Sequence, residues 1–133
     1  MGAAGLGSCK YVGLYFGAHW APPCRLFTTN LAEWYPKINA DGKVFEVIFV
    51  SIDGNADAFE RNFAEMPWLA VPYSDEARIA SLKQKFGING IPTLIIVDTN
   101  GNLVRAEGRE EITKDPAAAL EVWNTAKSAQ TAA

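Results

Sequence analysis

One cysteine stands where a helix is expected to begin, in a setting suited to thiol–disulfide chemistry. The chain reads Trp20-Ala21-Pro22-Pro23-Cys24 shortly after an apolar run. A side chain between a strand and a helix faces the positive end of the helix dipole and, on this pattern, exposed backbone N–H groups. A cysteine at position 21 would therefore have a lowered pKa and act as a nucleophile. Cys24, one turn further along, would resolve the mixed disulfide that forms.

The nucleophile itself is missing, because Ala21 occupies its position. A methyl group has no lone pair, so it can neither attack a disulfide nor form a mixed one. Cys24 is expected to face the core, where burial keeps the pKa of a thiol at or above its free value. The chain as given is therefore predicted to be nearly inert in dithiol exchange. The helix terminus at position 21 is expected to be exposed, so that a sulfur added there has little steric cost.

The strands that must position this segment are marked by apolar runs and by one turn signal. Two buried strands are predicted at Tyr11–Phe16 and Val44–Ile52. Two more, Thr93–Val97 and Leu103–Arg105, flank Asn100-Gly101, a strong signal for a tight hairpin. The order of the elements predicts that the first two strands pair in parallel and that the hairpin adds antiparallel strands at an edge.

Helices are predicted from apolar side chains at helical spacing and from end signals. The first follows position 21, and the second holds Phe59 and Phe63 one turn apart. Ser74 is expected to cap the third helix, which Gly87 ends. A last helix is predicted to start at Asp115-Pro116.

Length and composition indicate one domain. The chain has 133 residues, of which 49% are hydrophobic and 20% charged, and a net charge of −3, which suits one core in a globular protein. We expect the domain at residues 9–127, between a leader at 1–8 and a disordered tail at 128–133. The acidic balance argues against nucleic-acid binding, and no apolar run is long enough to span a membrane. A metal site is not expected, because His19 lacks partner ligands.

The segment around Cys24 resembles the W-C-P-P-C-R motif of tryparedoxins and nucleoredoxins, with the first cysteine replaced by Ala21. Further matches to that family extend over residues 10 to 115 and include Y-V-G-L-Y-F from Tyr11, F-E-V-I from Phe45, S-I-D from Ser51 and M-P-W-L-A-V-P from Met66. The resemblance implies an α/β thioredoxin fold, in which a central mixed sheet is flanked by helices on both faces.

The resemblance also implies a thiol–disulfide oxidoreductase that reduces protein disulfides and needs no cofactor, since the cysteine pair carries the electrons. Position 21 and Cys24 would be the nucleophile and the resolving thiol, and Trp20 and Pro92 would complete the catalytic site. Ile91-Pro92 is predicted to be a cis peptide that exposes the backbone of Ile91 to substrate. The substrate-binding groove would be formed by Trp20, Ile91, Pro92 and Trp68.

The sequence leaves two origins open for Ala21. It is either an engineered replacement, which we favour because the rest of the motif is intact, or the mark of a natural paralogue that has lost activity. The function is accordingly open between a reductase scaffold and a non-catalytic interaction module with a signalling partner. A periplasmic or peroxiredoxin-linked relative is disfavoured by the lack of an export signal. Because the two cysteines form no disulfide framework, we expect a reducing compartment, which is the cytoplasm with the nucleus as a second location. The chain is expected to be a monomer.

One part of plain thioredoxins is absent from this sequence. Tyr15 stands six residues before position 21, where plain thioredoxins carry a buried acid. A proton transfer assisted by a carboxylate at that position is therefore not expected, and Tyr15 is predicted to be a core residue.

Overall fold

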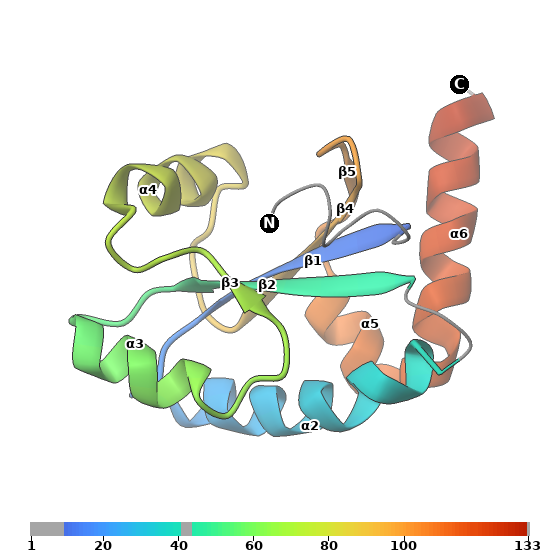
Figure 1. The fold of residues 1–133 in the computed structure, drawn as a ribbon. Coiled ribbons are helices and arrows are strands. Elements are labelled where there is room, and N and C mark those ends of the chain that lie inside the picture. Colours follow the sequence, from blue (N-terminus) through green and yellow to red (C-terminus); the bar gives the residue numbers. More distant parts are fainter. Residues whose placement is uncertain (1–9, 41–43, 133) are drawn as a thin grey trace.

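The centre of the molecule is a five-stranded mixed sheet with strand order β3-β2-β1-β4-β5 (Figure 1). The computed structural model describes residues 10–40 and 44–132. Strand β1 (Tyr11–Gly17) pairs in parallel with β2 (Phe45–Ser51) and antiparallel with β4 (Thr93–Asp98). The predicted parallel pairing of the two apolar runs is confirmed.

The hairpin at one edge of the sheet follows the turn signal in the sequence. Strand β5 (Leu103–Arg105) is antiparallel to β4. Gly101 adopts a φ of 87°, which residues with a side chain rarely adopt. The Asp98 carboxylate accepts hydrogen bonds from the backbone N–H groups of Asn100 and Asn102, at 2.9 and 3.0 Å. At the other edge, the two-residue β3 (Leu69–Ala70) is parallel to β2. It was not predicted, because two residues carry no pattern.

Helices cover both faces of the sheet, with α2 on one side and α4 on the other (Figure 1). The helices are α2 (Pro22–Ile38), α3 (Ala56–Phe63), α4 (Glu76–Lys85), α5 (Gly108–Lys114) and α6 (Pro116–Ala132). No helix among the described residues is long and apolar enough to cross a membrane.

The helices differ from the expected ones at the cap of α4, at α5 and at the C-terminal end of α6. Asp75, and not Ser74, caps α4, since its carboxylate accepts a hydrogen bond from the backbone N–H of Arg78. Helix α5 was not predicted. The segment from residue 128, expected as a tail, continues α6 to Ala132. The expected leader at residues 1–8 lies outside the described residues.

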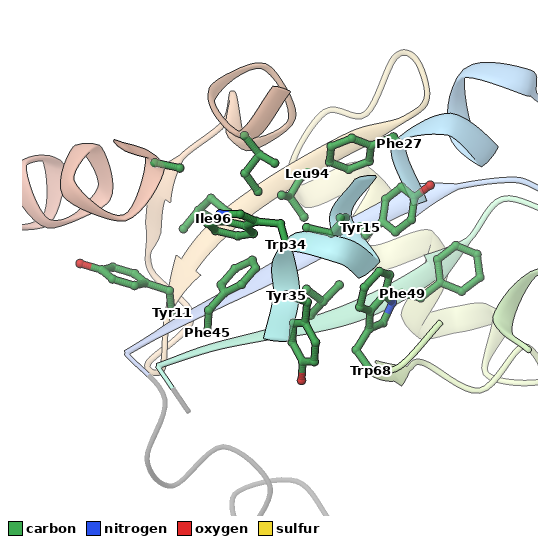
Figure 2. Packing of buried hydrophobic residues seen from close by; sticks show 14 of the residues in the cluster. Tyr11, Tyr15, Phe27, Trp34, Tyr35, Phe45, Phe49, Trp68, Leu94 and Ile96 are labelled. Carbon is green, nitrogen blue, oxygen red and sulfur yellow. The ribbon is translucent and has the colours of Figure 1, made fainter. Parts of the chain in front are cut away.

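Side chains of β1 alternate between two apolar clusters, one on each face, because successive side chains of a strand point to opposite sides. Tyr11 and Tyr15 join the larger cluster, which includes residues of α2, α5 and α6. Figure 2 shows its aromatic rings. Val12, Leu14 and Phe16 join the smaller cluster, which packs against α4. With both faces covered, β1 is buried along its whole length and holds the chain that follows it in a fixed place.

Candidate active site

The first turn of α2 offers no free backbone N–H group. Pro22 and Pro23 occupy its first two positions, and proline has no N–H. The N–H groups of Cys24 and Arg25 both donate to the carbonyl oxygen of Ala21, at 2.9 and 3.2 Å. The expectation of exposed N–H groups at this terminus was therefore wrong. A thiolate at position 21 would be stabilised instead by the helix dipole and by the Cys24 thiol one turn away.

The side chains around the start of α2 differ sharply in exposure. Trp20 is 65% exposed, whereas Ala21 is only 6% and Cys24 only 1% exposed. The expectation that position 21 is an exposed terminus was wrong, because the protein around it covers nearly all of the Ala21 residue. Cys24 faces the core, as the sequence predicted.

Burial raises the pKa of the Cys24 thiol above its ordinary value. A backbone hydrogen bond with Ala18 and the positive charge of Arg109 act against this rise, and the charge of Asp53 adds to it. The direction agrees with the one expected from the sequence. A raised pKa favours the protonated thiol at neutral pH.

Tyr15 lies under the first turn of α2, with its side chain fully buried. Its hydroxyl donates to the carbonyl oxygen of Cys24 at 2.9 Å and lies 2.6 Å from the hydroxyl of Thr28. Burial raises the pKa of Tyr15 well above its ordinary value, so the phenol stays protonated. Tyr15 thus fixes the backbone beside Cys24 without supplying a carboxylate.

We predict that Cys24 reacts slowly with iodoacetamide at neutral pH, because its thiol is buried and its pKa is raised. The measurement is the alkylation rate against pH in a Cys9→Ser variant, in which Cys24 is the remaining thiol. Unfolding in guanidinium should bring the rate to that of a free thiol. Fast alkylation at pH 6 in the folded protein would show instead that Cys24 is an activated thiolate.

Arg109 is a charged group at this site that the sequence reasoning missed. It is the second residue of α5, and its positive charge opposes the rise that burial causes in the pKa of both Cys24 and Tyr15. A Cβ on Gly108 would lie 2.8 Å from the carbonyl oxygen of Leu94 and 2.9 Å from the side chain of Ile96. Glycine at position 108 therefore lets α5 begin close against β4, which places Arg109 near the thiol.

Gly108→Ala is expected to lower the free energy of unfolding by about 1–3 kcal/mol, because the new methyl group meets backbone that cannot move aside cheaply. Urea denaturation measures the change. Gly54→Ala is the matched control, since a Cβ there meets nothing within 4 Å, and it should be neutral or slightly stabilising. Equal effects of the two substitutions would contradict the close approach of α5.

The structure separates two residues that the sequence placed in one groove. Ile91 packs at the smaller apolar cluster, and Trp68 is buried in the larger one, on the opposite face of the sheet. Trp68 is 5% exposed and packs edge to face against Tyr15 and Tyr35 (Figure 2). The predicted groove containing Trp68 was therefore wrong, because this indole is a core group. The Ile91-Pro92 peptide bond is cis.

Among the described residues, no group of three His, Cys, Asp or Glu side chains lies close enough to hold a metal ion.

Comparison with known proteins gives consistent matches. Residues 7–103 match a family model described as thioredoxin-like. The chain is 53% identical over 115 residues to nucleoredoxin of Danio rerio, covering 86% of this chain and 28% of that protein. It is 40% identical over 125 residues to tryparedoxin of Trypanosoma brucei brucei, covering 92% of this chain and 86% of that one.

Solved structures show the same likeness. Native tryparedoxin I from Crithidia fasciculata superposes with a TM-score of 0.79 at 43% identity, over 86% of this chain and 78% of that one. The chain thus spans about a quarter of the length of the nucleoredoxin it matches, and nearly all of the tryparedoxin.

Proposed function

The chain belongs to the thioredoxin-like family, with nucleoredoxins and tryparedoxins as relatives, and on that premise we propose that it carries a protein-disulfide reductase site whose nucleophile is missing. One observation carries the proposal. Ala21 is the residue directly before α2, and the thiol of Cys24 lies buried within the first turn of that helix. This is the spacing of a nucleophile and a resolving thiol.

The parent reaction needs one more sulfur, which Ala21→Cys supplies. The thiolate at position 21 attacks one sulfur of a substrate disulfide, the S–S bond breaks, and a mixed disulfide forms as the first substrate thiolate leaves. Cys24 then passes its proton to that thiolate and attacks the sulfur at position 21. The mixed disulfide breaks, and the second thiolate of the substrate leaves. Two electrons pass to the substrate, and an external dithiol returns them to the new disulfide.

The chain as given can take no part in the first step. Its rate of disulfide reduction is therefore proposed to equal the uncatalysed rate. The test is to measure insulin reduction by dithiothreitol with the chain as given and with Ala21→Cys. Catalysis by the chain as given, or its absence in a folded Ala21→Cys protein, would contradict the proposal.

An interaction module is the second candidate, favoured by the exposed apolar side chains at the start of α2. Trp20 and Leu26 are each 65% exposed, and both remain available when the nucleophile is absent. In this reading the surface binds an extended segment of a signalling partner without chemistry. Binding of a reduced and alkylated insulin B chain, lost in Trp20→Ala, would support it. Equal binding by the chain as given and by Trp20→Ala would contradict the interaction-module proposal.

Ile91 and Pro92 complete the substrate-binding residues of the proposal, together with Trp20. The substrates are proposed to be protein disulfides and dithiols. The redox equivalent is the cysteine pair, so no cofactor is proposed. A monomer in the cytoplasm, with the nucleus as a second location, fits a domain that reacts through free thiols.

A further inference from the structure

The turn after β2 is hydrogen-bonded to the loop that leads into α2. The Asp53 carboxylate accepts a hydrogen bond from the backbone N–H of His19 at 2.7 Å through one oxygen. Its other oxygen accepts from the hydroxyl of Ser51 at 2.5 Å, and the Ser51 oxygen in turn accepts from the backbone N–H of Asp53 at 3.0 Å. Ser51 and Asp53 are 2% and 6% exposed. Both carboxylate oxygens are therefore engaged inside the protein.

Two further bonds hold this turn in place. The Tyr73 hydroxyl donates to the carbonyl oxygen of Asp53 at 2.7 Å. The backbone N–H of Ile52 donates to the carbonyl oxygen of Gly17 at 2.9 Å, which joins the ends of β2 and β1. The carboxylate thus belongs to a rigid unit anchored to the sheet and to the chain before α4.

The loop has weaker restraints of its own. The backbone N–H of Ala21 lies 3.4 Å from the carbonyl oxygen of Ala18, a long hydrogen bond. The carbonyl oxygen of His19 accepts from the exposed guanidinium of Arg25 at 2.7 Å, where water competes. The hydrogen bond from His19 to the Asp53 carboxylate is short and part-buried, and hydrogen bonds to a charged group are about twice as strong as neutral ones.

We propose that Asp53 is a positioning residue, whose carboxylate holds the backbone of His19 so that Trp20 and position 21 are presented to substrate in the reactive geometry. The proposal rests on the proposed function, because it assigns Asp53 to the site of that reaction. In this role Asp53 acts through the loop by its hydrogen bond to His19, separately from the small effect of its charge on the pKa of Cys24. A misplacement of about 1 Å at a reacting atom can cost about 100-fold in rate.

The experiment uses Ala21→Cys in a Cys9→Ser background as the parent protein. Asp53→Ala should lower kcat for insulin reduction about 10- to 100-fold, with KM changed much less. Asp53→Asn should recover most of that loss, because the amide oxygen can accept from His19 while the amide nitrogen donates to the Ser51 oxygen. Asp75→Ala is the control, since it removes a carboxylate that caps α4 and does not touch the loop.

Hydrogen exchange at the His19 amide, measured in the chain as given, separates this proposal from the proposed function. Exchange should speed up in Asp53→Ala and return towards the original rate in Asp53→Asn, whether or not Ala21→Cys is active. A folded Asp53→Ala protein with unchanged kcat and unchanged His19 exchange would overturn the positioning role. A loss of kcat in Asp53→Ala that Asp53→Asn fails to recover would overturn the positioning role as well, because the hydrogen bond to His19 would then not be its cause.

Discussion

Ala21→Cys is expected to raise the rate of insulin reduction by dithiothreitol at least about 100-fold over the chain as given. The reason is that the mixed disulfide at position 21 is then released by the neighbouring Cys24 thiol, in an intramolecular step between two positioned sulfurs. The partner thiol is already in place in the first turn of α2. Positions 21 and 24 are one helical turn apart, within the reach of a disulfide. The rise in turbidity as the insulin B chain precipitates measures the rate.

Two controls show which atoms are responsible. Ala21→Ser adds an atom of similar placement without thiol chemistry and should stay at the uncatalysed rate. Cys24→Ser in the Ala21→Cys protein, reduced beforehand and mixed with insulin after the dithiothreitol is removed, should stop after the first exchange, because no second thiol at the site releases the mixed disulfide. That adduct should be visible by mass spectrometry as the protein plus its substrate. If Ala21→Cys stays at background while remaining folded, the reductase proposal fails and the interaction module becomes the better reading.

Trp123→Ala is expected to remove about 4 kcal/mol from the free energy of unfolding, which is a large share of the 5–15 kcal/mol typical of a domain. Trp123 is fully buried on α6. Its ring lies 4.9 Å from that of Phe45, 5.7 Å from that of Tyr11 and 6.0 Å from that of Trp34. Its indole N–H donates to the Glu111 carboxylate at 2.9 Å. One side chain thus ties α6 to β1, β2, α2 and α5.

Urea denaturation with a matched pair of variants isolates this effect. Trp20→Ala removes the same side chain from a 65% exposed position and should change stability by no more than about 0.5 kcal/mol. The loss of stability in Trp123→Phe should fall between the other two losses, since this variant keeps an apolar ring but removes the indole donor to Glu111, which retains its bond from Arg105. Similar losses from Trp20→Ala and Trp123→Ala would show that the aromatic cluster does not hold the domain together.

The sheet was predictable from the sequence because its signals are local. Runs such as Tyr11–Phe16 are nearly all apolar, which is typical of a strand covered on both faces. Asn100-Gly101 is a strong local signal for a hairpin, in which Gly101 supplies the positive φ of the turn. The cap of α4 was misassigned because Ser74 and Asp75 are adjacent and either side chain can cap a helix. Helix α5 was missed because it is short, with charged residues at four of its seven positions, so apolar periodicity is weak.

The site was less predictable because most of its contacts join distant segments. Asp53 and His19, which are hydrogen-bonded, lie 34 positions apart in the sequence, and no local pattern predicts such a pair. Trp68 belongs to a stretch that matches the family, but its side chain packs in the core, and only the fold shows which way it points. The burial of Cys24 was predicted correctly, because its place in the first helical turn decides which way its side chain points.

The residue before α2 makes no capping hydrogen bond through its side chain, and its carbonyl oxygen, which any residue carries, accepts both available N–H donors of the first turn. The hydrogen bonds that begin the helix therefore do not depend on which side chain stands at position 21, although that side chain is 6% exposed and must fit among its neighbours. On the proposed function, a single codon change there would switch electron transfer on or off without removing a hydrogen bond. Selection for redox activity would then act on this side chain, whereas the start of α2 is held by the backbone.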